Sequence, residues 1–213
     1  VDLDAAAERH PGGLWIFGYG SLMWRPGFRY ARAAQARLTG YHRCFCIYSM
    51  HHRGTEQRPG LVLGLDRAGV CEGIAFHVRQ EDMAATLDYL TVREQVSGVY
   101  RETQIPVTLL DGSHREVLAI AYVVERAHPS YAGDLPLRRQ ACLIRGAEGI
   151  SGANLDYLLN TLAHLRELRI RDRALERLAT LIGPHFARDP KPGPVSPRVA
   201  ALRSVCCRLP VPH

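Results

Sequence analysis

The stretch IPVTLLDGSHREVLAIAYVV, residues 105–124, decides the fold class of this chain. Two apolar runs of strand length, residues 105–110 and 117–124, are separated by Asp111, Gly112 and Ser113. These are residues that hairpin turns favour. The stretch therefore predicts an antiparallel hairpin.

Four further apolar runs of strand length precede this hairpin. They cover residues 14–17, 44–48, 61–65 and 73–78. The last two flank the sequence DRAG at residues 66–69, which predicts a second hairpin. About six strands are more than a pair of hairpins needs, and a small barrel or curled sheet is the natural way to protect their edges.

Helical periodicity appears between the two predicted hairpins and dominates the later part of the chain. Residues 81–96 carry apolar side chains at helical spacing. Three more helices are predicted over residues 137–145, after the N-cap candidate Asn154, and over residues 174–182. With strands early and helices late, the fold class is α+β, a small β-barrel or curled sheet with packed helices.

The predicted boundaries give one main domain with two appendages. The domain covers residues 14–185, an N-terminal extension covers residues 1–13, and a Pro-rich C-terminal tail covers residues 186–213. Within the tail, residues 199–205 form a short segment that receives no helix or strand assignment.

Composition is that of an ordinary globular protein. The chain has 213 residues, of which 46% are apolar, and a chain of this length buries roughly 70% of the surface that its unfolded form exposes. The longest apolar runs fall far short of the ~20 residues that a spanning helix needs, so no membrane association is expected. Residues 1–13 lack a basic start followed by an apolar stretch, and we expect a cytoplasmic protein.

Charge and cysteine spacing argue against two further classes of function. The formal net charge is +6, but the arginines are scattered among acidic residues, so no nucleic-acid partner is expected. The six cysteines include no C-x-x-C pair, so we expect no metal site. Cys44 and Cys46 are expected to be free thiols on one face of a strand.

Glu94 is the most informative single residue. It follows Leu90 by four positions and Leu87 by seven, so it continues the apolar stripe of the predicted helix toward the core. Burial and the negative end of the helix dipole both raise the pKa of a carboxyl group there. Such an acid fits a general acid/base at neutral pH. A salt bridge to Arg93 or Arg101, or a fraying helix end, is the alternative interpretation.

The segment FGYGSL, residues 17–22, is a second candidate feature. Two glycines around Tyr19 allow a sharp turn whose backbone N–H groups form an anion-binding nest. The spacing matches neither phosphate-binding glycine motif, and Ser21 does not fit the nucleophile elbow. An ordinary turn at the end of a strand remains the alternative.

Five groups of residues, taken in chain order, form a more specific pattern over residues 14–170. They are LWIFGYGSLMW at residues 14–24, Arg53-Gly54-Thr55 with Pro59-Gly60, Arg93-Glu94 with Gly98 and Tyr100, His128-Pro129-Ser130-Tyr131, and Gly149-Ile150-Ser151-Gly152 with Asn154 and Tyr157-Leu158. Together they closely resemble the ChaC family of γ-glutamylcyclotransferases. The spacing from Arg93 to Tyr100 resembles the bacterial branch rather than the animal one.

This resemblance implies a mixed barrel of the γ-glutamylcyclotransferase type that converts glutathione to 5-oxoproline and cysteinylglycine, with no cofactor. It implies that the carboxyl group of Glu94 is the general acid/base and that Tyr131 lies near the pocket. It assigns γ-glutamyl binding to the residues Ile16, Phe17, Gly18, Tyr19, Gly20, Ser21 and Leu22. The oligomeric state is left open.

The residues suit this chemistry on physical grounds. In a γ-glutamyl amide the substrate's own α-amine reaches the γ-carbonyl carbon, so the protein supplies no nucleophile. One carboxyl group of raised pKa can perform both proton transfers. Backbone N–H groups of residues 20–22 hold either the α-carboxylate or the oxyanion, and the sequence leaves both options open.

Three alternatives remain at this point. A cyclotransferase of the same fold would act on other γ-glutamyl amines or dipeptides. A non-catalytic regulatory protein would use the loop to bind a small anion. Association of the basic surface with RNA would depend strongly on salt.

Overall fold

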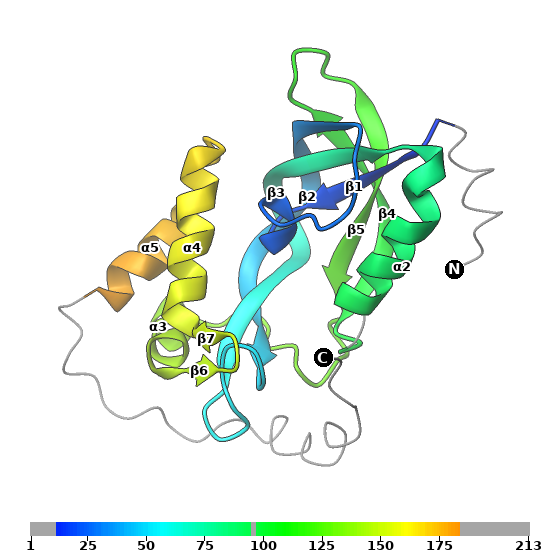
Figure 1. Ribbon diagram of the computed structural model, residues 1–213. Helices are drawn as coiled ribbons and strands as arrows, with labels where there is room; N and C mark the ends of the chain where they lie inside the picture. The colour runs from blue at the N-terminus through cyan, green and yellow to red at the C-terminus, as the bar shows by residue number, and fades with distance from the viewer. Residues whose placement is uncertain (1–11, 95–96, 184–213) are drawn as a thin grey trace. The chain divides into compact units, whose positions relative to one another are not determined.

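The computed structural model describes residues 12–94 and 97–183, which form two compact units (Figure 1). Of the described residues, the first unit comprises 12–44, 63–94, 97–125 and 163–171. The second unit comprises 45–62, 126–162 and 172–183. Glu94 and the loop after the first strand fall in the first unit, and Tyr131 falls in the second.

Five strands form a closed barrel in the order β1-β3-β2-β4-β5. Their bounds are β1 (Leu14–Gly18), β2 (Arg32–Ser49), β3 (Gly60–Val78), β4 (Tyr100–Leu109) and β5 (Glu116–Val124). β1 pairs antiparallel with β3 and parallel with β5, so the barrel is mixed. The expected small barrel of an α+β protein is confirmed, with five strands where about six were predicted.

All four predicted helices are present. They are α2 (Met83–Glu94), preceded by the 3-10 turn η2 (Gln80–Asp82), α3 (Leu137–Gly146), α4 (Asn154–Glu167) and α5 (Arg173–Ile182). Between α3 and α4 the short strands β6 (Glu148–Gly149) and β7 (Gly152–Ala153) pair with each other. Among the described residues, no helix has the length and apolar character required to cross a bilayer.

The hairpin predicted from residues 105–124 is confirmed. β4 and β5 pair antiparallel with Ile105 opposite Ala119. In the turn, the Ser113 N–H donates to Oδ1 of Asp111 at 3.0 Å, and Gly112 adopts a left-handed φ of 89°. Local turn chemistry therefore sets the register of this pair.

The second predicted hairpin is wrong. Residues 61–65 and 73–78 belong to the two halves of one strand, β3. The turn signal between them is real, because Ala68 and Gly69 have φ angles of 84° and 81°, as in a tight hairpin turn. Here β2 lies beside β3, and Nδ1 of His42 is 3.0 Å from the Ala68 carbonyl oxygen. The two left-handed residues form an irregularity inside a long strand instead of ending it.

β2 is also longer than predicted, since it starts at Arg32 rather than at residue 44. Ala34, Ala36 and Leu38 are buried, and the residues between them are exposed or half-buried, which is the period-two pattern of a strand. Alanine is depleted in strands, so this part of the pattern carried little signal in the sequence.

Close backbone approach explains one glycine in the barrel. β1 pairs with β3 so that Gly18 lies opposite Ile74. A Cβ atom added to Gly73 would lie 2.9 Å from Cζ of Phe17 and closer still to the carbonyl oxygen of Gly18. Glycine at position 73 therefore lets β3 approach the end of β1, where the candidate loop begins.

In the second unit, Asn154 has a role different from the predicted N-cap. Its side chain is completely buried: Oδ1 accepts from the Leu61 N–H and Nδ2 donates to the Leu61 carbonyl, both at 2.7 Å. This paired contact holds the beginning of β3 against the first turn of α4. The amide group satisfies two buried backbone groups of a strand instead of the free N–H groups of its own helix.

The predicted appendages fall largely outside the description. Only residues 12 and 13 of the N-terminal extension are described, and the tail of residues 186–213, with its segment 199–205, lies outside the described residues. The division into a domain with two appendages stays a prediction.

Candidate active site

Glu94 is the last residue of α2, and its side chain is 16% exposed. Leu87 and Leu90, on the same stripe of the helix, are buried. The predicted inward placement of this carboxyl group is confirmed. The apolar pattern carries the acid into the structure because positions 87, 90 and 94 share one helix face.

Burial raises the pKa of Glu94 above the ordinary glutamate range. Arg93 opposes this effect, because its Nε atom lies 3.0 Å from Oε1 of Glu94 and stabilises the ionised form. Burial is the larger influence, so the net shift is upward. The salt bridge and the raised pKa, which the sequence presented as alternatives, occur together.

The segment after β1 forms a compact turn that continues as the 3-10 helix η1 (Ser21–Met23). The Met23 N–H donates to the Gly20 carbonyl at 2.9 Å. A Cβ atom on Gly18 would lie 3.1 Å from Cβ of Leu22, so glycine allows the turn to fold back on the strand. Gly18 and Gly20 are absent from the positions with left-handed φ, which means that close packing, rather than backbone handedness, requires Gly18.

Most side chains of the predicted binding segment point into the protein. Ser21 is half-buried, and the other members, Ile16, Phe17, Gly18, Tyr19, Gly20 and Leu22, are buried. The buried members can reach a ligand only through their backbone atoms. Their part in substrate binding stays a prediction.

Tyr19 anchors this loop from inside the barrel. Its hydroxyl donates to the carbonyl oxygen of Tyr122 on β5 at 2.9 Å. The buried guanidinium of Arg43 on β2 donates to the Tyr19 carbonyl and, at 2.6 Å, to the carbonyl of Glu72. The turn is therefore fixed to two strands of the barrel.

Arg93 joins the loop to Glu94. Nη2 of Arg93 donates to Oγ of Ser21 at 2.9 Å, while Nε of the same guanidinium contacts Glu94. Two residues predicted for the site, separated by 73 positions in the chain, thus share one cation. The structure brings together the acid and the one half-buried side chain of the glycine-containing loop.

Tyr122 and Glu102 complete the polar surroundings, and neither was predicted from the sequence. Their positions are paired across β4 and β5, and the Tyr122 hydroxyl donates to Oε2 of Glu102 at 3.3 Å. Burial raises the pKa of Tyr122, and the charges of Glu102 and Glu94 raise it further. The negative charge of Glu94 therefore influences the pKa of Tyr122 in the barrel.

Arg43 and Tyr122 were missed for different reasons. Arg43 lies in the part of β2 that the prediction did not include. Tyr122 lies in an apolar run where a tyrosine resembles any other core residue. Only the folded chain brings the Arg43 guanidinium and the Tyr122 carbonyl oxygen to Tyr19.

Tyr131 lies in the second unit. It is half-buried and forms an isolated antiparallel bridge with Ile47, and its N–H donates to the His128 carbonyl at 2.9 Å. Its predicted place near the substrate stays a prediction.

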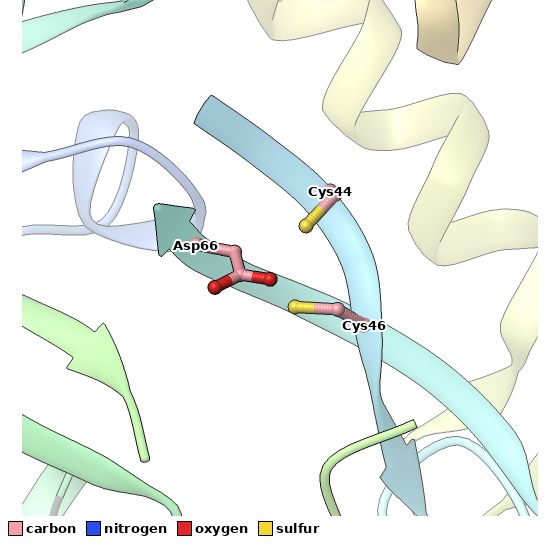
Figure 2. A group of neighbouring side chains, drawn as sticks. All are labelled: Cys44, Cys46 and Asp66. Carbon is pink, nitrogen blue, oxygen red and sulfur yellow. The ribbon is translucent and has the colours of Figure 1, made fainter. Parts of the chain in front are cut away.

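The strand cysteines show sheet contacts of their own. Figure 2 shows Cys44 and Cys46 projecting from β2 and Asp66 from β3. Sγ of Cys44 lies 4.0 Å from the Gly64 carbonyl, and Oδ1 of Asp66 accepts from the Arg67 N–H at 2.8 Å. Among the described residues, Cys44, Cys46, Cys71 and Cys142 form no disulfide.

The fold is a mixed barrel of the γ-glutamylcyclotransferase type. A crystal structure of a yeast γ-glutamyl cyclotransferase specific to glutathione superposes with a TM-score of 0.74 at 23% identity, covering 83% of this chain and 100% of that one. The model of the ChaC-like protein family matches residues 14–184. The chain belongs to this family.

Two curated relatives illustrate the similarity. The glutathione-specific γ-glutamylcyclotransferase of Escherichia coli is 34% identical over 195 residues, covering 92% of this chain and 84% of the relative. The mouse glutathione-specific γ-glutamylcyclotransferase 1 is 38% identical over 178 residues, covering 81% and 79%. The chain is similarly identical to the bacterial and the animal relative, so its place in the bacterial branch stays a prediction.

Proposed function

We propose that this protein is a glutathione-specific γ-glutamylcyclotransferase that converts glutathione to 5-oxoproline and cysteinylglycine. The observation that carries the proposal is the half-buried carboxyl group of Glu94, with its raised pKa, held through Arg93 next to Ser21. The names of the bacterial and animal relatives support glutathione as the substrate.

The enzyme must hold the substrate in a bent conformation, and it need not supply a nucleophile of its own. The α-nitrogen of the γ-glutamyl group attacks its own γ-carbonyl carbon, a C–N bond closes the five-membered ring, and the amide bond to cysteine breaks. Holding these two groups of one molecule in contact supplies much of the rate, since effective molarities of about 10⁵ to 10⁸ M are known for such ring closures.

Glu94 is the group we propose for the proton transfers. Its carboxylate takes a proton from the α-ammonium, and the resulting carboxylic acid gives a proton to the leaving nitrogen. Two protons leave the attacking nitrogen and two reach the leaving amine, so the reaction balances without water, oxidant or cofactor. A raised pKa suits both steps, because the group must accept and release a proton near neutral pH.

The loop of residues 20–22 is the group we propose for binding the γ-glutamyl part. The first N–H groups of the 3-10 helix η1 have no acceptor within that helix. They suit the α-carboxylate or the oxyanion of the tetrahedral intermediate, and the Ser21 hydroxyl adds a polar group beside them.

This function implies a cellular location and a kind of partner. We propose that the protein acts in the cytoplasm on a small molecule, with neither nucleic acid nor membrane as a partner. Glutathione is a cytoplasmic thiol, and the reduced thiols of the described residues suit a reducing compartment.

The test is to incubate the purified full chain with glutathione and to quantify 5-oxoproline and cysteinylglycine by mass spectrometry. We expect the two products in equal amounts. γ-Glutamyl-alanine and γ-glutamyl-lysine serve as competing substrates, and faster turnover of either would assign the enzyme to other γ-glutamyl amines. Binding of glutathione without any product would support a non-catalytic anion-binding protein.

A further inference from the structure

Arg93 has more polar partners than the salt bridge to Glu94 alone requires. Nε contacts Glu94, and Nη2 contacts Oγ of Ser21 at 2.9 Å. Nη1 donates to the hydroxyl of Tyr89 at 2.9 Å and to two carbonyl oxygens that follow η1, those of Arg25 and Pro26. Each nitrogen of the guanidinium therefore has a different target.

The geometry of the pair with Glu94 is unusual for a helix. Consecutive residues of a helix point about 100° apart and do not normally face each other. Arg93 and Glu94 nonetheless meet at 3.0 Å with side chains that are 21% and 16% exposed. The Arg93 side chain extends to the loop that follows β1, where it contacts Ser21 and two backbone oxygens while its Nε stays on Glu94.

We propose that Arg93 is a positioning residue that sets the place of the Glu94 carboxyl group relative to Ser21 and the loop of residues 20–26. The proposal rests on the proposed cyclotransferase function, in which Glu94 transfers the protons and this loop binds the γ-glutamyl group. Arg93 acts through these two groups, and its planar fork is what allows it to hold both at once.

The substitutions Arg93→Lys and Arg93→Gln separate the effect of the geometry of Arg93 from the effect of its charge. Lysine keeps a positive charge but has a single nitrogen, which cannot reach Glu94, Ser21 and the backbone oxygens together. Glutamine removes the charge as well. Among the described residues, the ionisable groups near this pair include Tyr122 on β5, whose pKa is raised by the charge of Glu94, Glu102 on β4, which contacts Tyr122, and Tyr89 on α2, which contacts Arg93.

The test is a double-mutant cycle on turnover of glutathione. We expect Ser21→Ala to lower kcat/KM by about tenfold, mainly by raising KM, and Arg93→Lys to lower it at least as much with a clear fall in kcat, because the Glu94 carboxyl group loses its place. The loss in the double variant should be smaller than the product of the two single losses, because both changes remove the contact between Arg93 and Ser21. Losses that multiply in the double variant would overturn the proposal.

A pH profile adds a readout that a purely structural role would not move. In Arg93→Gln the acidic limb of kcat/KM should shift to higher pH, because Glu94 loses its cation. In Arg93→Lys it should stay nearer to the wild-type position. Arg79→Gln is the matched control, because the ion pair between Arg79 and Glu81 lies exposed at the surface. An unchanged limb in Arg93→Gln would contradict the proposal.

Carbon-13 NMR titration of the Glu94 carboxyl group separates failure of this proposal from failure of the function. If wild-type protein turned over no γ-glutamyl compound, the function would fail, while the titration would still report whether Arg93 controls Glu94. If Arg93→Gln does not fold, the titration is made on Arg93→Met, which also removes the charge beside Glu94. An identical titration in wild type and the folded variant would overturn the role of Arg93.

Discussion

The hydroxyl of Tyr19 donates a hydrogen bond to the carbonyl oxygen of Tyr122 at 2.9 Å. Tyr19 lies in the glycine-containing loop, and Tyr122 is the barrel residue whose pKa responds to the charge of Glu94. The contact fixes the loop to the strand beside the acid. It also occupies the phenol of Tyr19, while Ser21 is the half-buried side chain of this loop.

Replacing Glu94 by glutamine should abolish the proton transfers while preserving the shape of the site. We expect formation of 5-oxoproline from glutathione to fall by at least about 10²-fold, the lower end of what general acid/base catalysis contributes. The measurement is product formation under saturating glutathione, with circular dichroism to show that the fold is intact. Retention of more than a few per cent of wild-type turnover would reject the role of Glu94.

The same substitution should change how stability depends on pH. Because the pKa of Glu94 is raised in the folded state, the folded protein holds this proton more tightly than the unfolded chain. The contribution of Glu94 to the free energy of unfolding therefore falls as pH rises from the ordinary glutamate pKa through the raised one. Urea denaturation of both proteins at several pH values should show wild type losing stability relative to Glu94→Gln over this window, and a constant difference would contradict the raised pKa.

The pH dependence of catalysis should report the same group. Glu94 must be ionised in the free enzyme to accept a proton, so the acidic limb of kcat/KM should lie above the ordinary glutamate range. Initial rates with glutathione across the pH range measure it. A limb at the pKa of an exposed glutamate would show that another group controls the rate.

Ser21→Ala should weaken substrate binding more than it slows the chemical step. The hydroxyl is held by Arg93 rather than by a base, which suits positioning rather than nucleophilic attack. We expect KM to rise by about tenfold with a smaller change in kcat. Ser113→Ala, in the β4–β5 turn, is the control with unchanged kinetics. A complete loss of kcat in Ser21→Ala would assign the hydroxyl a direct part in catalysis.

Asn154→Ala should strongly destabilise the second unit. It leaves the N–H and carbonyl groups of Leu61 buried and unpaired, which costs about 2–4 kcal/mol at typical values for such groups. Chemical denaturation monitored by fluorescence measures the loss. Asn160→Ala, at an exposed position of the same helix, should change stability little. Equal effects of the two substitutions would show that the contact with Leu61 is unimportant.

Gly73→Ala should destabilise the barrel where β3 passes the end of β1. The added Cβ would overlap the Gly18 carbonyl and the Phe17 ring, and overpacking of this kind costs about 1–3 kcal/mol. Thermal unfolding measures it, with Gly12→Ala as the control because a Cβ there meets open space. Unchanged stability in Gly73→Ala would mean that the strands separate easily at this point.

The elements predicted correctly are those with local signals. The hairpin of β4 and β5 has its turn chemistry within the turn itself, and Glu94 stands out because an acid continues an apolar stripe. The turn signal at Ala68 and Gly69 was also real, but the partner of each half of β3 is decided by distant strands. A local pattern reports backbone angles and cannot report which strand lies alongside.

The polar contacts of the site could not be predicted from the spacing of residues in the sequence. Arg43 and Tyr122 meet Tyr19 only after the barrel has closed, and nothing near them in the chain indicates that meeting. Arg93 was visible as a possible partner of Glu94, but its contact with Ser21 joins two segments separated by the whole of β2 and β3.

The parallel pairing of β1 with β5 affects how the protein is made on the ribosome. Tyr19 and Tyr122 lie 103 positions apart, so β1 cannot pair with β5 until residues 116–124 have been translated. Pairings of such long sequence separation form slowly, and until then the nascent β1 keeps an open edge. The pairing of β1 with β5 completes the barrel that holds the loop after β1 near Glu94. Nascent chains that stop short of β5 should therefore be inactive and prone to aggregate.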